Sequence, residues 1–143
     1  MRTLPLLVAI LALVLAGCGE TTDIVGTVKA GTLPPYTTKP IGKAFDAAFP
    51  GGTWTGSTSG MGEGEMVAQF RSTGTAEALE ASGVPAIDRK DCIDNTQRPC
   101  RIPVSFQFTL SPDTRSITLA LVEAPKPMRS GEQLNALLAF VYR

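Results

Sequence analysis

The sequence contains no histidine, and this absence excludes more chemistry than any other feature of its composition. Histidine is the side chain whose unperturbed pKa lies near neutrality, so proton transfer would need a carboxylate or lysine with a strongly shifted pKa. A Ser-His-Asp triad, a Cys-His pair and a histidine metal cluster cannot be built from this chain. No serine has a lysine three positions later, which also removes the Ser-x-x-Lys nucleophile. We therefore expect a protein that is not an enzyme.

The chain also has no excess of charge. Its 143 residues include 13 Lys plus Arg and 13 Asp plus Glu, which gives a formal net charge of zero. Nucleic-acid binding depends on clustered positive charge that displaces counterions from the phosphates. We expect no nucleic-acid partner.

No apolar run is long enough to span a bilayer. The longest uninterrupted run, Leu6 to Ala16, has 11 residues, whereas a spanning helix needs about 20. Arg2 precedes the run and small residues follow it, an order typical of a secretory signal peptide. We expect residues 1–17 to be a cleaved leader.

The leader ends in Leu15-Ala16-Gly17-Cys18, which resembles the lipobox of bacterial lipoproteins. The resemblance implies attachment of a diacylglyceryl group to the Cys18 thiol, cleavage before Cys18 and acylation of the new amino terminus. Two or three acyl chains would anchor the protein almost permanently, because each buried methylene contributes about 0.8 kcal/mol. In the enterobacterial sorting rule, Gly19 in the next position favours the periplasmic face of the outer membrane. The alternative is an ordinary secreted protein with an incidental cysteine.

Two cysteines remain, Cys92 and Cys100, in a polar segment that contains proline. An exported protein meets an oxidising compartment, so this pair predicts a disulfide bond. A closed ring of about nine residues contributes roughly 2.5 kcal/mol in the chain-entropy model. The alternative is a zinc site, for which two cysteines without histidine supply only half of a tetrahedral shell. We expect no metal and no cofactor.

Removal of the leader leaves 126 residues with a net charge of −1, which is one domain of ordinary size. Residues 18–38 are rich in Thr, Gly and Pro and predict a lipidated tether, with a short strand near Ile24 to Lys29. Residues 39–143 predict a single folded domain.

Within that domain the apolar periodicity changes several times. A helix is predicted after Pro40, and strands over Thr53–Ser59 and Glu65–Ser72. A short helix is predicted over Thr75–Ser82, with Thr75 as its N-cap. Alternation with a period of two predicts a second hairpin, whose apolar positions are Val104, Phe106, Phe108 and Leu110, then Ile117, Leu119 and Leu121. A capping box at Ser130 begins a terminal helix with an apolar stripe of Leu134, Leu137, Leu138 and Val141.

The order helix, hairpin, short helix, hairpin, helix predicts an α+β fold, with an antiparallel sheet of about four strands and helices packed on one face. The pieces Ile41-Gly42-Lys43-Ala44-Phe45-Asp46 and Val104-Ser105-Phe106-Gln107-Phe108-Thr109 also resemble a group of small exported bacterial domains of uncharacterised function. The resemblance covers most of Gly31 to Arg143. It implies the same α+β fold and gives no activity to carry over.

Candidate binding residues are few. Trp54 could stack on a sugar or anchor a partner, although core burial is favoured for a lone tryptophan in a strand. Arg98 lies in the loop that the predicted disulfide closes and Arg101 directly follows it, and both are candidate partner contacts. The remaining acidic candidates are better explained as charged residues of solvated loops. They are Glu63 and Glu65, weighed as an acid–base pair, and Asp88, Asp91 and Asp94, weighed as a calcium site.

These features predict a non-enzymatic, lipid-anchored protein of the cell envelope that acts as a binding or structural accessory module. Its expected partners are the membrane, through acyl chains on Cys18, and an envelope protein. The alternative is a periplasmic inhibitor or immunity factor that plugs the cleft of a lytic enzyme with the loop 92–100. A hydrolase that depends on carboxylates is a third hypothesis.

Overall fold

The computed structural model describes residues 23–58, 65–84, 88–94, 96, 98–111, 116–128 and 130–143. The expected leader, Cys18 and Glu63 lie outside these residues. The described elements, in chain order, are α1 (Ile24–Ala30), α2 (Ile41–Ala48), β1 (Thr53–Thr58), β2 (Met66–Thr75), α3 (Ala76–Ala81), the 3-10 turn η1 (Arg89–Asp91), β3 (Arg101–Leu110), β4 (Ile117–Glu123) and α4 (Gly131–Val141).

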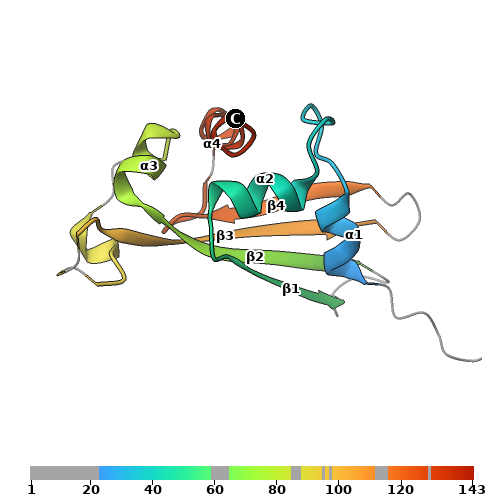
Figure 1. The fold of residues 1–143 in the computed structure, drawn as a ribbon, viewed down its shortest axis with the longest axis horizontal. Coiled ribbons are helices and arrows are strands. Elements are labelled where there is room, and N and C mark those ends of the chain that lie inside the picture. The colour runs from blue at the N-terminus through green and yellow to red at the C-terminus, as the bar shows by residue number, and fades with distance from the viewer. Residues whose placement is uncertain are drawn as a thin grey trace, which may run out of the picture.

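The described strands form one antiparallel sheet in the order β1-β2-β3-β4. The helices α1 to α4 all lie on the same side of this sheet, and α4 is seen end-on where it crosses above the strands (Figure 1). Stacking a helix layer on one face of a sheet covers the apolar surface of both. The predicted α+β class, with helices on one face of a four-stranded antiparallel sheet, is confirmed.

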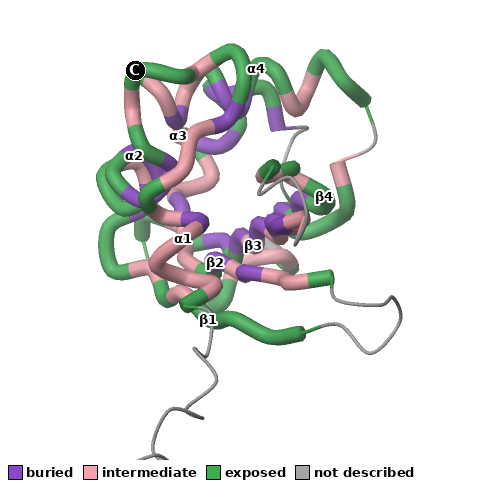
Figure 2. The backbone as a smooth tube through the Cα atoms, turned by 90° about the vertical axis from the view of Figure 1, so that its right-hand side faces the viewer, coloured by how far each residue is buried: buried purple, intermediate pink, exposed green. Residues whose placement is uncertain are grey.

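Alternation along β3 builds the sheet side of the core, as its sequence predicts. Its buried positions are Ile102, Val104, Phe106, Phe108 and Leu110, and the positions between them point to the other face. Phe45 of α2 is fully buried, and its ring meets those of Phe106 and Phe70 edge-on at centroid distances of 4.8 and 5.9 Å. Figure 2 shows the buried segments where the helices face the sheet.

Side-chain caps set the ends of the helices that flank the second hairpin. Thr75 Oγ1 accepts a hydrogen bond from the backbone N–H of Ala78 at 3.2 Å and begins α3. Gly83 follows that helix with a φ of 95°, a conformation that glycine adopts without steric cost. Ser130 Oγ accepts from the N–H of Gln133 at 3.1 Å and begins α4. Both predicted N-caps are confirmed.

The prediction of a short strand near Ile24 to Lys29 is wrong, because this segment is the helix α1. Asp23 Oδ1 caps the helix by accepting from the N–H of Gly26 at 2.9 Å. The β-branched residues that favour a strand are overruled by packing, since Val28 is fully buried on the side that faces the core.

The folded unit therefore begins earlier than the predicted boundary at residue 39. Val28 and Leu33, both expected in the tether, are part of the buried core. Lys29 of α1 forms an ion pair with Asp46 of α2 at 3.1 Å, so the two helices are also joined at their surface. The chain between Cys18 and α1 is much shorter than the sequence pattern suggested.

The apolar alternation predicted for β4 holds for Ile117 and Leu119 and fails at Leu121. Phe108 pairs with Leu119, but the adjacent Gln107 pairs with Leu121, so β4 contains one extra residue at this point. This bulge reverses the alternation. Val122 is consequently buried, whereas Leu121 is 40% exposed on the face away from the helices.

Candidate functional site

The face of the sheet opposite the helices carries polar side chains in rows that cross the strands. Residues paired across neighbouring strands share a face, so one row contains Thr53, Arg71, Ser105 and Glu123. The next row contains Thr55, Gln69, Gln107 and Leu121. We call this surface the open face, because the labelled helices of Figure 1 all lie on the other side.

A hollow of about 270 Å³ lies on the open face where β2, β3 and β4 run side by side. Six of the residues that line it are Gln69, Arg71, Pro103, Ser105, Glu123 and Pro125. The polar side chains stand on strands, so the backbone ladder fixes their spacing. The two prolines give the hollow apolar wall surface.

The charges of the hollow are of opposite sign and stand on either side of Ser105. Gln69 Nε2 donates to Ser105 Oγ at 3.1 Å, which orients both neutral groups. The Arg71 guanidinium and the Glu123 carboxylate form no ion pair or side-chain hydrogen bond with any other described residue. Both charges are therefore available to a ligand.

Trp54 is half-buried at the edge of the core. Its ring lies 4.7 Å from that of Phe70, and its Nε1 donates to Asp46 Oδ1 at 2.8 Å. Lys29 Nζ lies 5.7 Å from the centre of the indole. The ring of this tryptophan is thus used in core packing and its N–H in a hydrogen bond within the protein. The indole has little freedom to anchor a partner.

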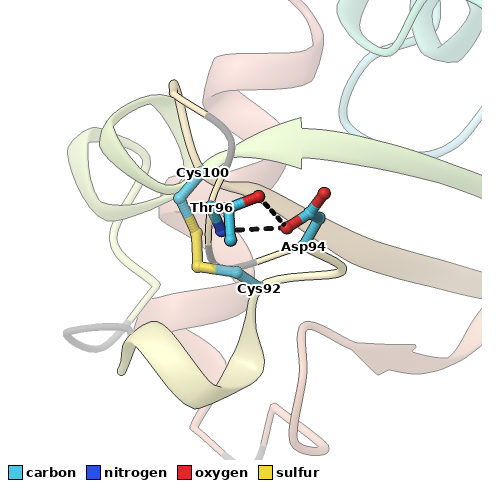
Figure 3. The surroundings of a disulfide bond; sticks show 4 residues. All are labelled: Cys92, Asp94, Thr96 and Cys100. Carbon is cyan, nitrogen blue, oxygen red and sulfur yellow. Dashed lines mark hydrogen bonds between the residues drawn. A yellow bond between two sulfur atoms is a disulfide. The ribbon is translucent and has the colours of Figure 1, made fainter.

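The disulfide bond between Cys92 and Cys100 is present, as predicted (Figure 3). Asp94 Oδ1 accepts hydrogen bonds inside the closed loop from the N–H and the hydroxyl of Thr96, at 2.9 and 2.6 Å. The N–H of Ile93 donates to the carbonyl of Arg101 at 3.0 Å and holds the loop against the start of β3. The Ile93 side chain is 63% exposed, an apolar group displayed on a constrained loop.

The two arginines predicted to contact a partner differ in their surroundings. Arg101 Nε and Nη2 both donate to Thr73 Oγ1, at 3.0 and 2.6 Å, so this guanidinium lies along β2. Arg98 is exposed on the closed loop. Arg98 and Arg101 lie at the disulfide loop and the start of β3, whereas Trp54 packs beside α2, so the three do not form one site.

The acidic residues weighed for catalysis or calcium do not gather. Asp88 pairs with Lys90 at 3.2 Å, Asp94 is used within its own loop, and Glu65 is exposed. Among the described residues, no three His, Cys, Asp or Glu side chains lie close enough together to hold a metal ion. Nor does the described part of the chain contain a helix long and apolar enough to cross a membrane.

The Tyr142 hydroxyl is buried without a hydrogen-bond partner in the described part of the chain, while its ring stacks on Tyr36 at a centroid distance of 4.4 Å. Burial, and secondarily the neighbouring Tyr36, raise the pKa of Tyr142 from 10.0 to about 12. The unfolded chain therefore loses this proton at lower pH than the folded chain. Stability from this group is complete below pH 10 and is lost as the pH rises toward 12.

We expect Tyr142→Phe to keep or slightly raise the free energy of unfolding at pH 7, because it removes an unsatisfied buried hydroxyl. It should also reduce the loss of stability between pH 10 and pH 12. Urea unfolding at several pH values measures both effects against the wild-type protein. Tyr36→Phe should leave most of the loss at high pH in place, because burial is the larger cause of the raised pKa of Tyr142. A loss of more than about 1 kcal/mol at pH 7 would show that the hydroxyl has a partner in the folded protein.

The sequence pattern did not single out Gln69, Arg71, Ser105 or Glu123. Alternation places polar residues on one face of each strand, but only the register brings these four together. Comparison with protein-family models, with curated proteins and with solved structures finds no match. The resemblance to small exported domains therefore stays a prediction, and the site has to be interpreted from its own geometry.

Proposed function

We propose that this protein is a non-enzymatic binding module of the cell envelope, anchored to a membrane by acyl chains on Cys18. The observation that carries the binding role is the hollow on the open face, where Arg71 and Glu123 stand unpaired among the described residues on either side of Ser105. The helices cover the opposite face, so the open face is the side that can meet a partner.

The lining of the hollow favours binding over hydrolysis. Its carboxylate is Glu123, and its other named polar groups are a guanidinium, an amide and a hydroxyl. Glycoside hydrolysis uses two carboxyl groups, one of them with a raised pKa. A guanidinium stays protonated at any physiological pH and cannot take the second role.

A short connection to the lipid supports a module held close to the bilayer. Four residues lie between Cys18 and Asp23, the cap of α1, and the five steps from one Cα to the next reach at most about 18 Å. The disulfide loop lies at the other end of the sheet from α1 (Figure 1). The ten residues of β2 cover most of that separation, about 34 Å in an extended strand. The loop is thus placed away from the anchor.

Detergent phase partitioning tests the anchor. We expect the wild-type protein to enter the detergent phase and the Cys18→Ser variant to stay in the aqueous phase, because the thiol that carries the diacylglyceryl group is gone. The variant with both Cys92→Ser and Cys100→Ser is the matched control and should partition like the wild type. Recovery of the wild type in the aqueous phase would contradict the proposal.

A second function is favoured by one specific observation, the 63% exposure of Ile93 on a loop closed by a disulfide. Inhibitors commonly present a rigid loop with an apolar anchor, since a constrained loop loses little entropy on binding. In this role the loop 92–100 would enter the cleft of a lytic enzyme. Adding the protein to lysozyme and to a peptidoglycan amidase tests it, with Ile93→Asp as the inactive control; full residual activity would exclude these targets.

A further inference from the structure

We propose that the hollow on the open face binds a small zwitterion, a ligand that carries a carboxylate and an ammonium group such as a free α-amino acid. This inference rests on the proposed binding function and names the chemistry that the site would recognise. It follows from three properties of the hollow: the order of its charges, its rigidity and its size.

The order of the charges is set by the register of three strands. Arg71 on β2 pairs with Ser105 on β3, and Ser105 pairs with Glu123 on β4. Neighbouring strands lie about 4.8 Å apart, so the backbones of Arg71 and Glu123 are separated by roughly 10 Å. A carboxylate over one end of the row and an ammonium over the other would each meet the opposite charge.

The chemistry of each end suits one half of such a ligand. A guanidinium presents parallel N–H donors that match the two oxygens of a carboxylate. The Glu123 carboxylate accepts hydrogen bonds from an ammonium group. Between them, Gln69 and Ser105 are already joined by a hydrogen bond of 3.1 Å and offer further neutral donors and acceptors.

The site is built on rigid backbone. β2 and β3 pair without interruption from Met66 opposite Leu110 to Thr75 opposite Arg101. The end of β4 is held from its outer side, where the N–H of Met128 donates to the carbonyl of Val122 at 2.9 Å and Glu123 forms a bridge with Pro127. Binding would need little backbone ordering, which favours a small ligand.

The size of the hollow limits the ligand. A volume of about 270 Å³ lies below the range typical of sites for drug-sized molecules. Pro103 and Pro125 add apolar surface that could meet a short side chain. The alternative is that Arg71 and Glu123 turn toward each other in solution and form an exposed ion pair, which would leave no site.

Titration of the mature protein in detergent micelles tests the inference. L-alanine and D-alanine are the zwitterionic probes. Propionate and ethylamine, which carry one charge each, are the control ligands. Amide chemical shifts report binding. We expect saturable shifts of Gln69 and Ser105 with alanine at concentrations up to about 50 mM. Propionate and ethylamine should bind at least about 10-fold more weakly, because each can meet only one of the two charges of the hollow.

Charge-removing variants test whether alanine binding depends on Arg71 and Glu123. Arg71→Gln and Glu123→Gln should each weaken alanine binding about 10-fold, whereas Lys43→Gln and Glu132→Gln, which remove the same charges from the exposed surfaces of α2 and α4, should change it less than about twofold. The double variant Arg71→Glu with Glu123→Arg keeps both charges and should recover binding. The carboxylate of the ligand would then lie at position 123 and its ammonium group at position 71.

Saturable shifts that need both charges would support the zwitterion site. An absence of shifts at Gln69 and Ser105 with both enantiomers, or binding that survives Arg71→Gln and Glu123→Gln, would overturn it. Detergent partitioning is measured on the same samples. If alanine does not bind but the protein still enters the detergent phase, only the zwitterion inference is overturned. If the protein stays in the aqueous phase, the proposed membrane-anchored function is overturned.

Discussion

Replacing Phe45 by alanine is expected to lower the free energy of unfolding by about 3–5 kcal/mol, the usual cost of truncating a buried phenylalanine. Phe45 is fully buried, and its ring lies edge-on to five others, those of Trp54, Phe70, Phe106, Phe108 and Tyr142. These rings come from β1, β2, β3 and the end of α4. A cavity here would loosen the contact of the helix layer with the sheet.

Denaturant unfolding monitored by circular dichroism measures this loss. Phe140→Ala is the matched control, since Phe140 is only partly buried and meets Phe49 at a centroid distance of 6.1 Å. The control should lose clearly less stability than Phe45→Ala. Equal losses in the two variants would show that Phe45 does not occupy the centre of the core.

The second large effect is expected from the loop. Replacing both Cys92 and Cys100 by serine should lower the free energy of unfolding by about 2.5 kcal/mol, because the unfolded chain is no longer constrained by a ring of nine residues. For a domain of this length, that loss corresponds to a fall of about 10 °C in melting temperature.

Reduction of the wild-type protein should reproduce the melting temperature of the double serine variant. The variant itself should not respond to the reductant. The loop would keep its hydrogen bond from Ile93 to Arg101, so the sheet should remain intact by circular dichroism. A change of less than about 2 °C would show that the disulfide does not constrain the unfolded chain.

The fold class could be predicted from the sequence because local and long-range signals agree in most elements. The alternation from Val104 to Leu110, the cap at Ser130 and the cap at Thr75 each match one secondary structure and one buried face. Two predictions failed for physical reasons. In α1, burial of Val28 overrules β-propensity, and in β4 a bulge exchanges the faces of Leu121 and Val122.

The hollow could not be predicted by the same means. Arg71, Ser105 and Glu123 are polar residues on the solvent side of their strands, where sequence patterns carry little information. Their meeting depends on the pairing of three strands, and on the bulge in β4 that places Glu123 opposite Ser105. The disulfide was predictable because the cysteines were few and the expected leader implied an oxidising compartment.

We propose a small anchored sheet whose helix-free face would receive a ligand. In this proposal its chemistry would be that of recognition, by two opposite charges and by hydrogen bonds, on a backbone that does not need to rearrange. The short chain before α1 would keep this surface close to the membrane, and the disulfide loop would stand at the opposite end of the sheet.

Mass spectrometry of the amino-terminal peptide of the native protein tests the central claim most directly. The account predicts that the mature chain begins at Cys18, with a diacylglyceryl group on its sulfur and an acyl chain on its amino group. A mature chain with an unmodified Cys18 thiol would contradict the account, and the envelope role built on that anchor would have to be withdrawn.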